Sequence, residues 1–190
     1  MGNRHYRLAG VCAITALVLF LSNTSCSSTS QPSTPPPMQA TLPAPEFVSG
    51  TPGSVFINPK SQAVEPASQI KVSIEVVPAG WGISAVEVQV SFDPKRLEAV
   101  SVKPGSALGA NPIEGTSKID NAQGTIIYAL ARQGETTAPG AKGVLANIEF
   151  RGKSGASGTT KIELTKVGLS DENFQAIAGV TSDGASIVFP

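Results

Sequence analysis

Few side chains in this sequence could support acid–base or nucleophilic chemistry. The single histidine, His5, lies in the amino-terminal segment ahead of an apolar run. Without a histidine elsewhere, neither a Ser-His-Asp nor a Cys-His arrangement can form, and zinc loses its usual ligands. Two carboxylates would suffice for glycoside hydrolysis, but the 14 acidic residues are scattered and are all explained as solvated groups. The sequence therefore predicts a protein that is not an enzyme and holds no metal or cofactor.

Four loop segments offer weaker binding chemistry. Asp171-Glu172-Asn173 and Asp183 supply oxygen atoms of the kind that calcium prefers, but they lack the alternating acidic spacing of a calcium loop, which favours turn formation. Residues 152–158 are rich in glycine but have no P-loop spacing, and we expect a hairpin loop there. Trp81, the one tryptophan, could stack on a sugar ring, although capping of the core is the favoured role.

The amino-terminal residues 1–26 have the pattern of an export signal. Arg4 and Arg7 precede fourteen mostly apolar residues, 8–21, a run too short to span the ~30 Å hydrocarbon layer of a membrane comfortably. Cys26 resembles the lipidated cysteine of bacterial lipoproteins, although Asn23 stands where that pattern prefers an apolar residue. Ordinary cleavage and an uncleaved anchor are the alternatives. We expect an exported protein, either held at the cell surface by a lipid on Cys26 or released outside the cell.

Residues 27–52 are expected to be a disordered linker, and residues 53–190 a folded domain. The linker is mainly Ser, Thr, Pro and Gln, so it has too little apolar surface to fold, and its prolines keep it extended. It is either a spacer that lifts the domain off a surface or a linker without a selected role. Removal of Arg4 and Arg7 with the signal leaves 12 basic against 14 acidic residues, a balance that favours neither nucleic acid nor an anionic membrane surface as a partner. Membrane contact is expected through a lipid anchor alone.

The domain is predicted to be all-β. It shows no sustained helical periodicity, and short runs of alternating apolar and polar residues recur between Gly, Pro, Asn and Asp. The expected strands are 54–57, 69–77, 83–92, 97–102, 117–120, 125–131, 143–150, 160–166 and 185–189. Nine such strands suit a jelly-roll β-sandwich, which leaves few exposed sheet edges in an exported domain that has no cysteine pair.

The segment 85–92 has the clearest strand pattern. Val86, Val88 and Val90 alternate with polar or small residues, and Asp93-Pro94 ends the strand because proline fixes φ and offers no ladder donor. This strand and turn resemble the cohesin family. Further matching segments, in the same order along the chain, are 69–77, Leu97-Glu98, 102–105, 124–126, 143–150 and Asp171. The resemblance extends over residues 54–189 and depends on order and spacing, and related sandwich modules that bind polysaccharide share the architecture.

The resemblance implies a non-catalytic receptor for a dockerin, a small calcium-loaded helical module attached to an enzyme of extracellular polysaccharide degradation. In the family, the third, fifth, sixth and eighth strands present a flat outer face to the dockerin. The matching outward positions are Ala85, Glu87, Gln89 and Ser91 on the third strand, and Thr125, Ile127, Ala129 and Ala131 on the sixth. Glu87 stands where many members place an acidic acceptor of hydrogen bonds, whereas Ala85 replaces an asparagine that those members often have.

Two other functions stay open at this point. One is a carbohydrate-binding module of the related sandwich type, in which Trp81 would contact the sugar. The other is a structural domain of an envelope assembly whose partner has no dockerin. The residues proposed for docking also have plain explanations, because Glu87 can be a solvated strand residue and Ile127 a lone exposed apolar side chain.

Overall fold

The computed structural model describes residues 53–134 and 140–190, and every regular element in them is a strand. The strands are β1 (Ser54–Asn58), β2 (Ser61–Ala63), β3 (Gln69–Val77), β4 (Ala85–Phe92), β5 (Leu97–Pro104), β6 (Ile113–Asp120), β7 (Thr125–Ala131), β8 (Gly143–Gly152), β9 (Gly158–Ser170), β10 (Thr181–Asp183) and β11 (Ala185–Phe189). No helix in these residues is long and apolar enough to cross a membrane. The expected signal, linker and lipidated Cys26 lie outside the described residues.

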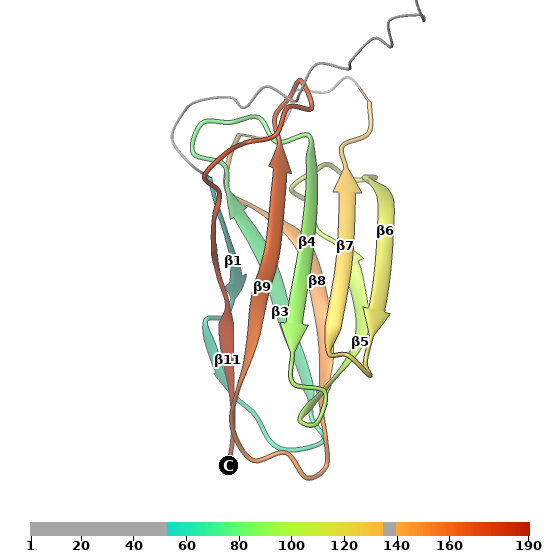
Figure 1. Cartoon of the computed structure of the whole chain (residues 1–190), viewed down its shortest axis with the longest axis vertical. Coiled ribbons are helices and arrows are strands. Elements are labelled where there is room, and N and C mark those ends of the chain that lie inside the picture. Colours follow the sequence, from blue (N-terminus) through green and yellow to red (C-terminus); the bar gives the residue numbers. More distant parts are fainter. Residues whose placement is uncertain (1–52, 135–139) are drawn as a thin grey trace, which may run out of the picture. The chain divides into compact units, whose positions relative to one another are not determined.

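The strands form two sheets that pack face to face. One sheet has the order β10-β1-β3-β8-β5, and the other has the order β2-β11-β9-β4-β7-β6. Figure 1 shows β11, β9, β4, β7 and β6 side by side in the nearer layer, with β1, β3 and β8 behind them. The predicted all-β sandwich is therefore confirmed, and so is the grouping of the third, fifth, sixth and eighth expected strands in one sheet, as β4, β6, β7 and β9.

The predicted strand number is wrong: all nine expected strands are present, but the described residues contain eleven. The two missed strands, β2 and β10, are three residues long and pair in parallel with β11 and β1. Their side chains are exposed or half exposed, so they carry no alternating apolar pattern. Several strand ends also differ from the expected ones: among them, β4 begins at Ala85, β6 begins at Ile113, and β9 continues to Ser170.

The core lies between the sheets and consists of the inward side chains of both. Val88 and Val90 of β4 and Ile70 and Ile74 of β3 are at most 1 % exposed. Phe92 and the facing Phe150 meet edge to face, with ring centroids 5.2 Å apart, although they stand on different sheets. Because alternate side chains fill this core, the other side of each sheet faces outward.

Four of the described strands contain an extra residue that shifts the register and changes which side chains face outward: β8 at Leu145, β9 at Thr165, β5 at Val100 and β6 at Gly115. In β8 the register against β3 shifts at Leu145, so Leu145 and Ala146 are both buried before alternation resumes at Asn147. This bulge lets two consecutive residues of β8 face the core. In β9 the register against β4 shifts at Thr165, whose hydroxyl donates to the carbonyl oxygen of Gln89 at 3.2 Å. Beyond this bulge, β9 continues alongside the first half of β4.

Candidate functional site

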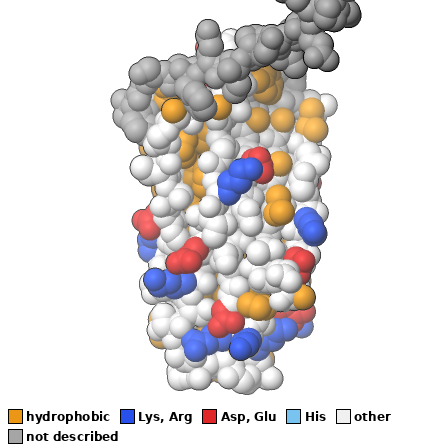
Figure 2. Space-filling model, in the orientation of Figure 1, with side chains coloured by type: hydrophobic (Ala, Val, Ile, Leu, Met, Phe, Trp, Pro, Cys, Tyr) orange, Lys and Arg blue, Asp and Glu red, His pale blue; other side chains and the backbone are white. Residues whose placement is uncertain are grey.

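The candidate site is the outward face of β9, β4, β7 and β6, which we call the β4–β7 face. All of the outward residues predicted for partner binding lie on it, each half buried or exposed between buried neighbours. The cross-strand pairs from β4 to β7 are Ala85 with Ala131, Glu87 with Ala129, Gln89 with Ile127, and Ser91 with Thr125. The sequence alternation therefore placed these residues correctly on one surface, which is nearest to the viewer in Figures 1 and 2.

The half of this face that includes Ala85 is hollowed, because its side chains are small. The hollow has a volume of about 390 Å³, and Ala85, Ala129 and Gly168 are among the residues that line it. Ile113, which is 53 % exposed, stands at its rim on the edge strand β6. Figure 2 shows hydrophobic side chains gathered in the upper part of the face and few charged ones between them. Such a hollow can receive an apolar side chain from a partner.

Glu87 carries the one acidic side chain in the lining of this hollow, and it already has a partner. The Lys166 ammonium lies 2.8 Å from a Glu87 carboxylate oxygen, and both side chains are about half exposed. An exposed pair of this kind adds little to stability, about 0–1 kcal/mol. A partner that donates a hydrogen bond to Glu87 therefore has to share its carboxylate with Lys166.

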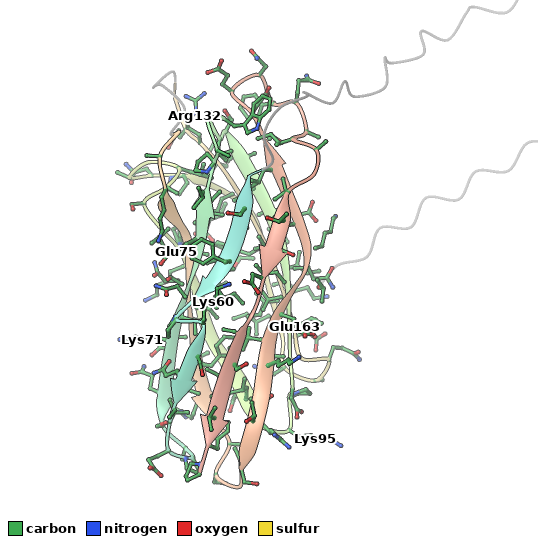
Figure 3. All side chains as sticks on the ribbon, turned by 90° about the vertical axis from the view of Figure 1, so that its left-hand side faces the viewer. Lys60, Lys71, Glu75, Lys95, Arg132 and Glu163 are labelled. Atoms are coloured by element: carbon green, nitrogen blue, oxygen red, sulfur yellow. The ribbon has the colours of Figure 1, made fainter. Side chains whose placement is uncertain are left out.

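The other half of the face carries side chains of both charges. Ile127 pairs with Gln89 on one side and with Lys118 of β6 on the other. Asp120 of β6 and Glu163 of β9 lie in the rung beyond, opposite Thr125 and Ser91. Figure 3 shows Glu163 on this side of the sandwich and Lys71 on the opposite side.

Sequence reasoning missed several contributors to the hollow, among them Ile113, Gly115 and Gly168. The first two fall in the part of β6 before residue 117, where every side chain is exposed and no apolar alternation marks a strand. Gly168 lies in the part of β9 beyond the bulge, where glycine gives no strand signal. Their contribution could be recognised only once β6 and β9 were aligned with β7 and β4.

Comparison with known proteins assigns the family. Residues 53–188 match the family model described as Cohesin domain. The chain belongs to the cohesin family. A curated relative, cellulose-binding protein A of Clostridium cellulovorans, is 29 % identical over 143 residues. The match covers 72 % of this chain but spans only 7 % of the length of that relative.

Solved cohesins have the same fold. The seventh ScaB type I cohesin of Pseudobacteroides cellulosolvens superimposes with a TM-score of 0.60 at 23 % identity, over 73 % of this chain and 92 % of that one. A cohesin from Clostridium thermocellum, solved in the Coh-OlpA-Doc918 complex with a dockerin, has a TM-score of 0.62 at 13 % identity, over 74 % of this chain and 100 % of that one. A non-cellulosomal cohesin of the archaeon Archaeoglobus fulgidus has a TM-score of 0.58 at 15 % identity, over 74 % of this chain and 92 % of that one.

The other loop residues of this cohesin domain have structural roles. Trp81 lies in the loop between β3 and β4, as expected, and packs partly buried against the core. Asp171 is 4 % exposed, and its carboxylate accepts the backbone N–H groups of Asn173 and Gln175 at 2.9 and 2.8 Å. Asp171 therefore organises a turn. Among the residues that the structure describes, no three potential metal ligands of the His, Cys, Asp or Glu type gather together.

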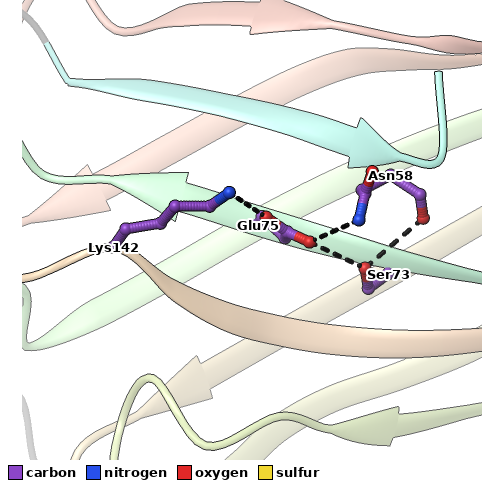
Figure 4. Close-up of polar contacts among 4 residues, drawn as sticks. All are labelled: Asn58, Ser73, Glu75 and Lys142. Carbon is purple, nitrogen blue, oxygen red and sulfur yellow. Dashed lines mark hydrogen bonds and ion pairs between the residues drawn. The ribbon is translucent and has the colours of Figure 1, made fainter.

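A buried carboxylate braces the opposite sheet of the cohesin domain. Glu75 of β3 is 7 % exposed and lies 2.8 Å from the Lys142 ammonium. It also accepts hydrogen bonds from the Asn58 amide at 2.8 Å and the Ser73 hydroxyl at 3.3 Å (Figure 4). The Lys142 contact lowers the pKa of Glu75, with help from Asn58 and Ser73, against the opposing effect of burial. This cluster joins β1 and β3 to the residues just before β8.

Proposed function

We propose that this cohesin domain is a non-catalytic receptor that binds the dockerin module of another protein through the β4–β7 face. The observation that carries the proposal is this open face, with small side chains, few charges and a hollow, on a domain of the cohesin family. Solved relatives with the same fold were crystallised as complexes with dockerins. The face is of the same general kind as the apolar centre of a protein interface, where charged residues are depleted.

The geometry also indicates what the partner has to offer. An apolar side chain fits the hollow beside Ala129, and a donor group can compete with Lys166 for Glu87. Calcium in the complex belongs to the dockerin in this proposal, and this chain supplies no ligand for it. Because Ala85 is smaller than asparagine and has no side-chain amide, the partner contact at this position is packing instead of hydrogen bonding.

Placement of the domain outside the cell is part of the same proposal. It is supported by the export pattern of residues 1–26, the proline-rich residues 27–52 and the cysteine at position 26. A lipid on Cys26 would hold the domain at the cell surface, and the linker would allow it to reach a partner enzyme of polysaccharide degradation. The alternative role as a carbohydrate-binding module depended on Trp81, and the packing of Trp81 against the core does not favour it.

The test is binding to dockerin-bearing proteins encoded by the same organism. We expect at least one of them to bind, and we expect Glu87→Lys to weaken that complex by about 2–4 kcal/mol, because the new cation faces Lys166 and removes the acceptor. Glu149→Lys, the same charge change on the other sheet, is the matched control and is expected to bind like the parent. Failure of the folded domain to bind any dockerin would remove the proposal.

A further inference from the structure

A second hollow lies on the outward side of the other sheet, which the proposed function does not use. It has a volume of about 480 Å³ and lies over the middle of β3, β8 and β5. The cross-strand register arranges its outward side chains in two rungs: Ser73, Asn147 and Lys103 form one, and Lys71, Glu149 and Ser101 form the other. The hollow exists because serines alternate with lysines at the four corners, so two corners are low and two are high.

The charges around this hollow are unbalanced. Lys71, Lys103 and Arg151 project outward from these strands, and none of them forms an ion pair within the described residues. The acidic residues nearby are mostly occupied, since Glu98 pairs with Lys153 and Glu75 with Lys142. Glu149 is the remaining carboxylate. The two lysines stand two strands apart, roughly 10 Å across the sheet, so together they favour an extended anionic ligand.

The polar groups on the floor of the hollow favour a ligand that has hydrogen-bonding groups in addition to negative charge. Glu149 offers only acceptors and makes one long contact, from the Ser101 hydroxyl at 3.4 Å, so it is open to hydrogen bonds from a ligand that donates. Asn147 offers donors and an acceptor together. Hydroxyl groups both donate and accept, so a ring that carries several of them satisfies this floor, whereas a ligand with carboxylates alone is repelled by Glu149. No aromatic side chain lines the hollow, so a neutral sugar chain would gain no stacking.

From these observations we infer that the β3–β8–β5 hollow binds an acidic polysaccharide whose sugar rings carry carboxylates. Lys71 and Lys103 contact the carboxylates, and Asn147 and Glu149 pair with ring hydroxyls. Since the β4–β7 face belongs to the other sheet, a partner protein there and a glycan here can be bound at the same time. The domain would then hold its partner close to an acidic glycan, at a site that is independent of the dockerin proposal.

The experiment measures binding of the full chain to polygalacturonate, to its fully methyl-esterified form and to poly-L-glutamate by calorimetry at low and high salt. We expect polygalacturonate to bind at least tenfold more tightly than either of the others, and salt to weaken its binding. Lys71→Gln combined with Lys103→Gln is expected to reduce binding about tenfold or more. Lys95→Gln, which removes an exposed lysine outside the hollow, is the matched control and should leave binding unchanged.

Two further variants test the hydrogen bonds and the location of the site. Asn147→Ala tests the hydrogen bonds to the ring hydroxyls, and Glu87→Lys tests which sheet holds the ligand. Asn147→Ala is expected to weaken polygalacturonate binding severalfold, and Glu87→Lys on the other sheet is expected to leave it unchanged. Equal binding of poly-L-glutamate would overturn the saccharide assignment, and equal binding of the esterified polymer would overturn the charge argument. A change of binding in Glu87→Lys, in either direction, would place the ligand on the β4–β7 face. The absence of polygalacturonate binding at low salt would end the inference.

Discussion

The two outer faces of the sandwich are built on the same core but have opposite surface chemistry. On the β4–β7 face, half of the residues that line the hollow are alanine or glycine, and Glu87 and Lys166 neutralise each other. On the opposite face, the hollow is lined by lysine, serine, asparagine and glutamate, and cations are in excess. Each hollow lies on the outward side of one of the two sheets. The difference shows that the inward residues specify the fold, while the outward residues are free to specify what each side binds.

The faces also differ in how their acidic residues are held. Glu75 is almost fully buried and has three partners, whereas Glu87 is half exposed and has one. A buried carboxylate that loses a partner is left in a poorly solvated place, while an exposed one is taken up by water. Glu75 should therefore contribute to stability, and Glu87 to recognition.

The largest effect is expected from filling the hollow of the β4–β7 face. Ala129→Arg places a long charged side chain where the partner has to pack, so we expect the affinity for a cognate dockerin to fall at least a hundredfold, about 3 kcal/mol. The midpoint of thermal unfolding should stay close to that of the parent, because Ala129 points outward. Asn147→Arg makes a similar change on the opposite face and should leave docking intact. Calorimetric titration checks both, and equal affinities for the two variants would contradict the assignment of the faces.

An intermediate effect is expected from Glu75→Gln. The amide loses the ion pair with Lys142 and one acceptor oxygen inside a buried cluster, so the free energy of unfolding should decrease by about 1–3 kcal/mol. Glu87→Gln removes the exposed pair with Lys166 and should change the free energy of unfolding by about 0.5 kcal/mol or less. Urea unfolding at neutral pH measures both. If the two variants lose the same stability, the proposed contrast between the faces does not hold.

The smallest effect is the pH dependence of the stability that Glu75 contributes to the fold. The pKa of Glu75 in the folded domain is below its ordinary value, so ionised Glu75 stabilises the fold above the unfolded-state pKa of about 4.3. This contribution is lost as the pH falls through the lower, folded-state pKa. The stability gap between the parent and Glu75→Gln should therefore be constant near neutral pH and narrow in acid, as urea unfolding at a series of pH values will show. A gap that widens on acidification would be inconsistent with the lowered pKa.

Sequence patterns worked best where burial is one-sided. The alternation around Val88 and Tyr128 correctly predicted strands β4 and β7, their inward side chains and their outward faces. Patterns failed for β2 and β10, since short exposed strands have no buried side to mark them.

The amino-acid sequence by itself therefore determined the fold class, the strands with buried sides and, on the clearest of those strands, the side chains that face outward. The tertiary structure alone decided which of those side chains meet. It aligned Gly168 with Glu87, brought Lys166 within 2.8 Å of a carboxylate 79 residues away, and covered the outward Glu75 with Lys142. It also set Lys71 and Lys103 on either side of β8. The physical reason is that alternation is a property of one strand, whereas hollows and ion pairs depend on register between strands that are distant in the chain.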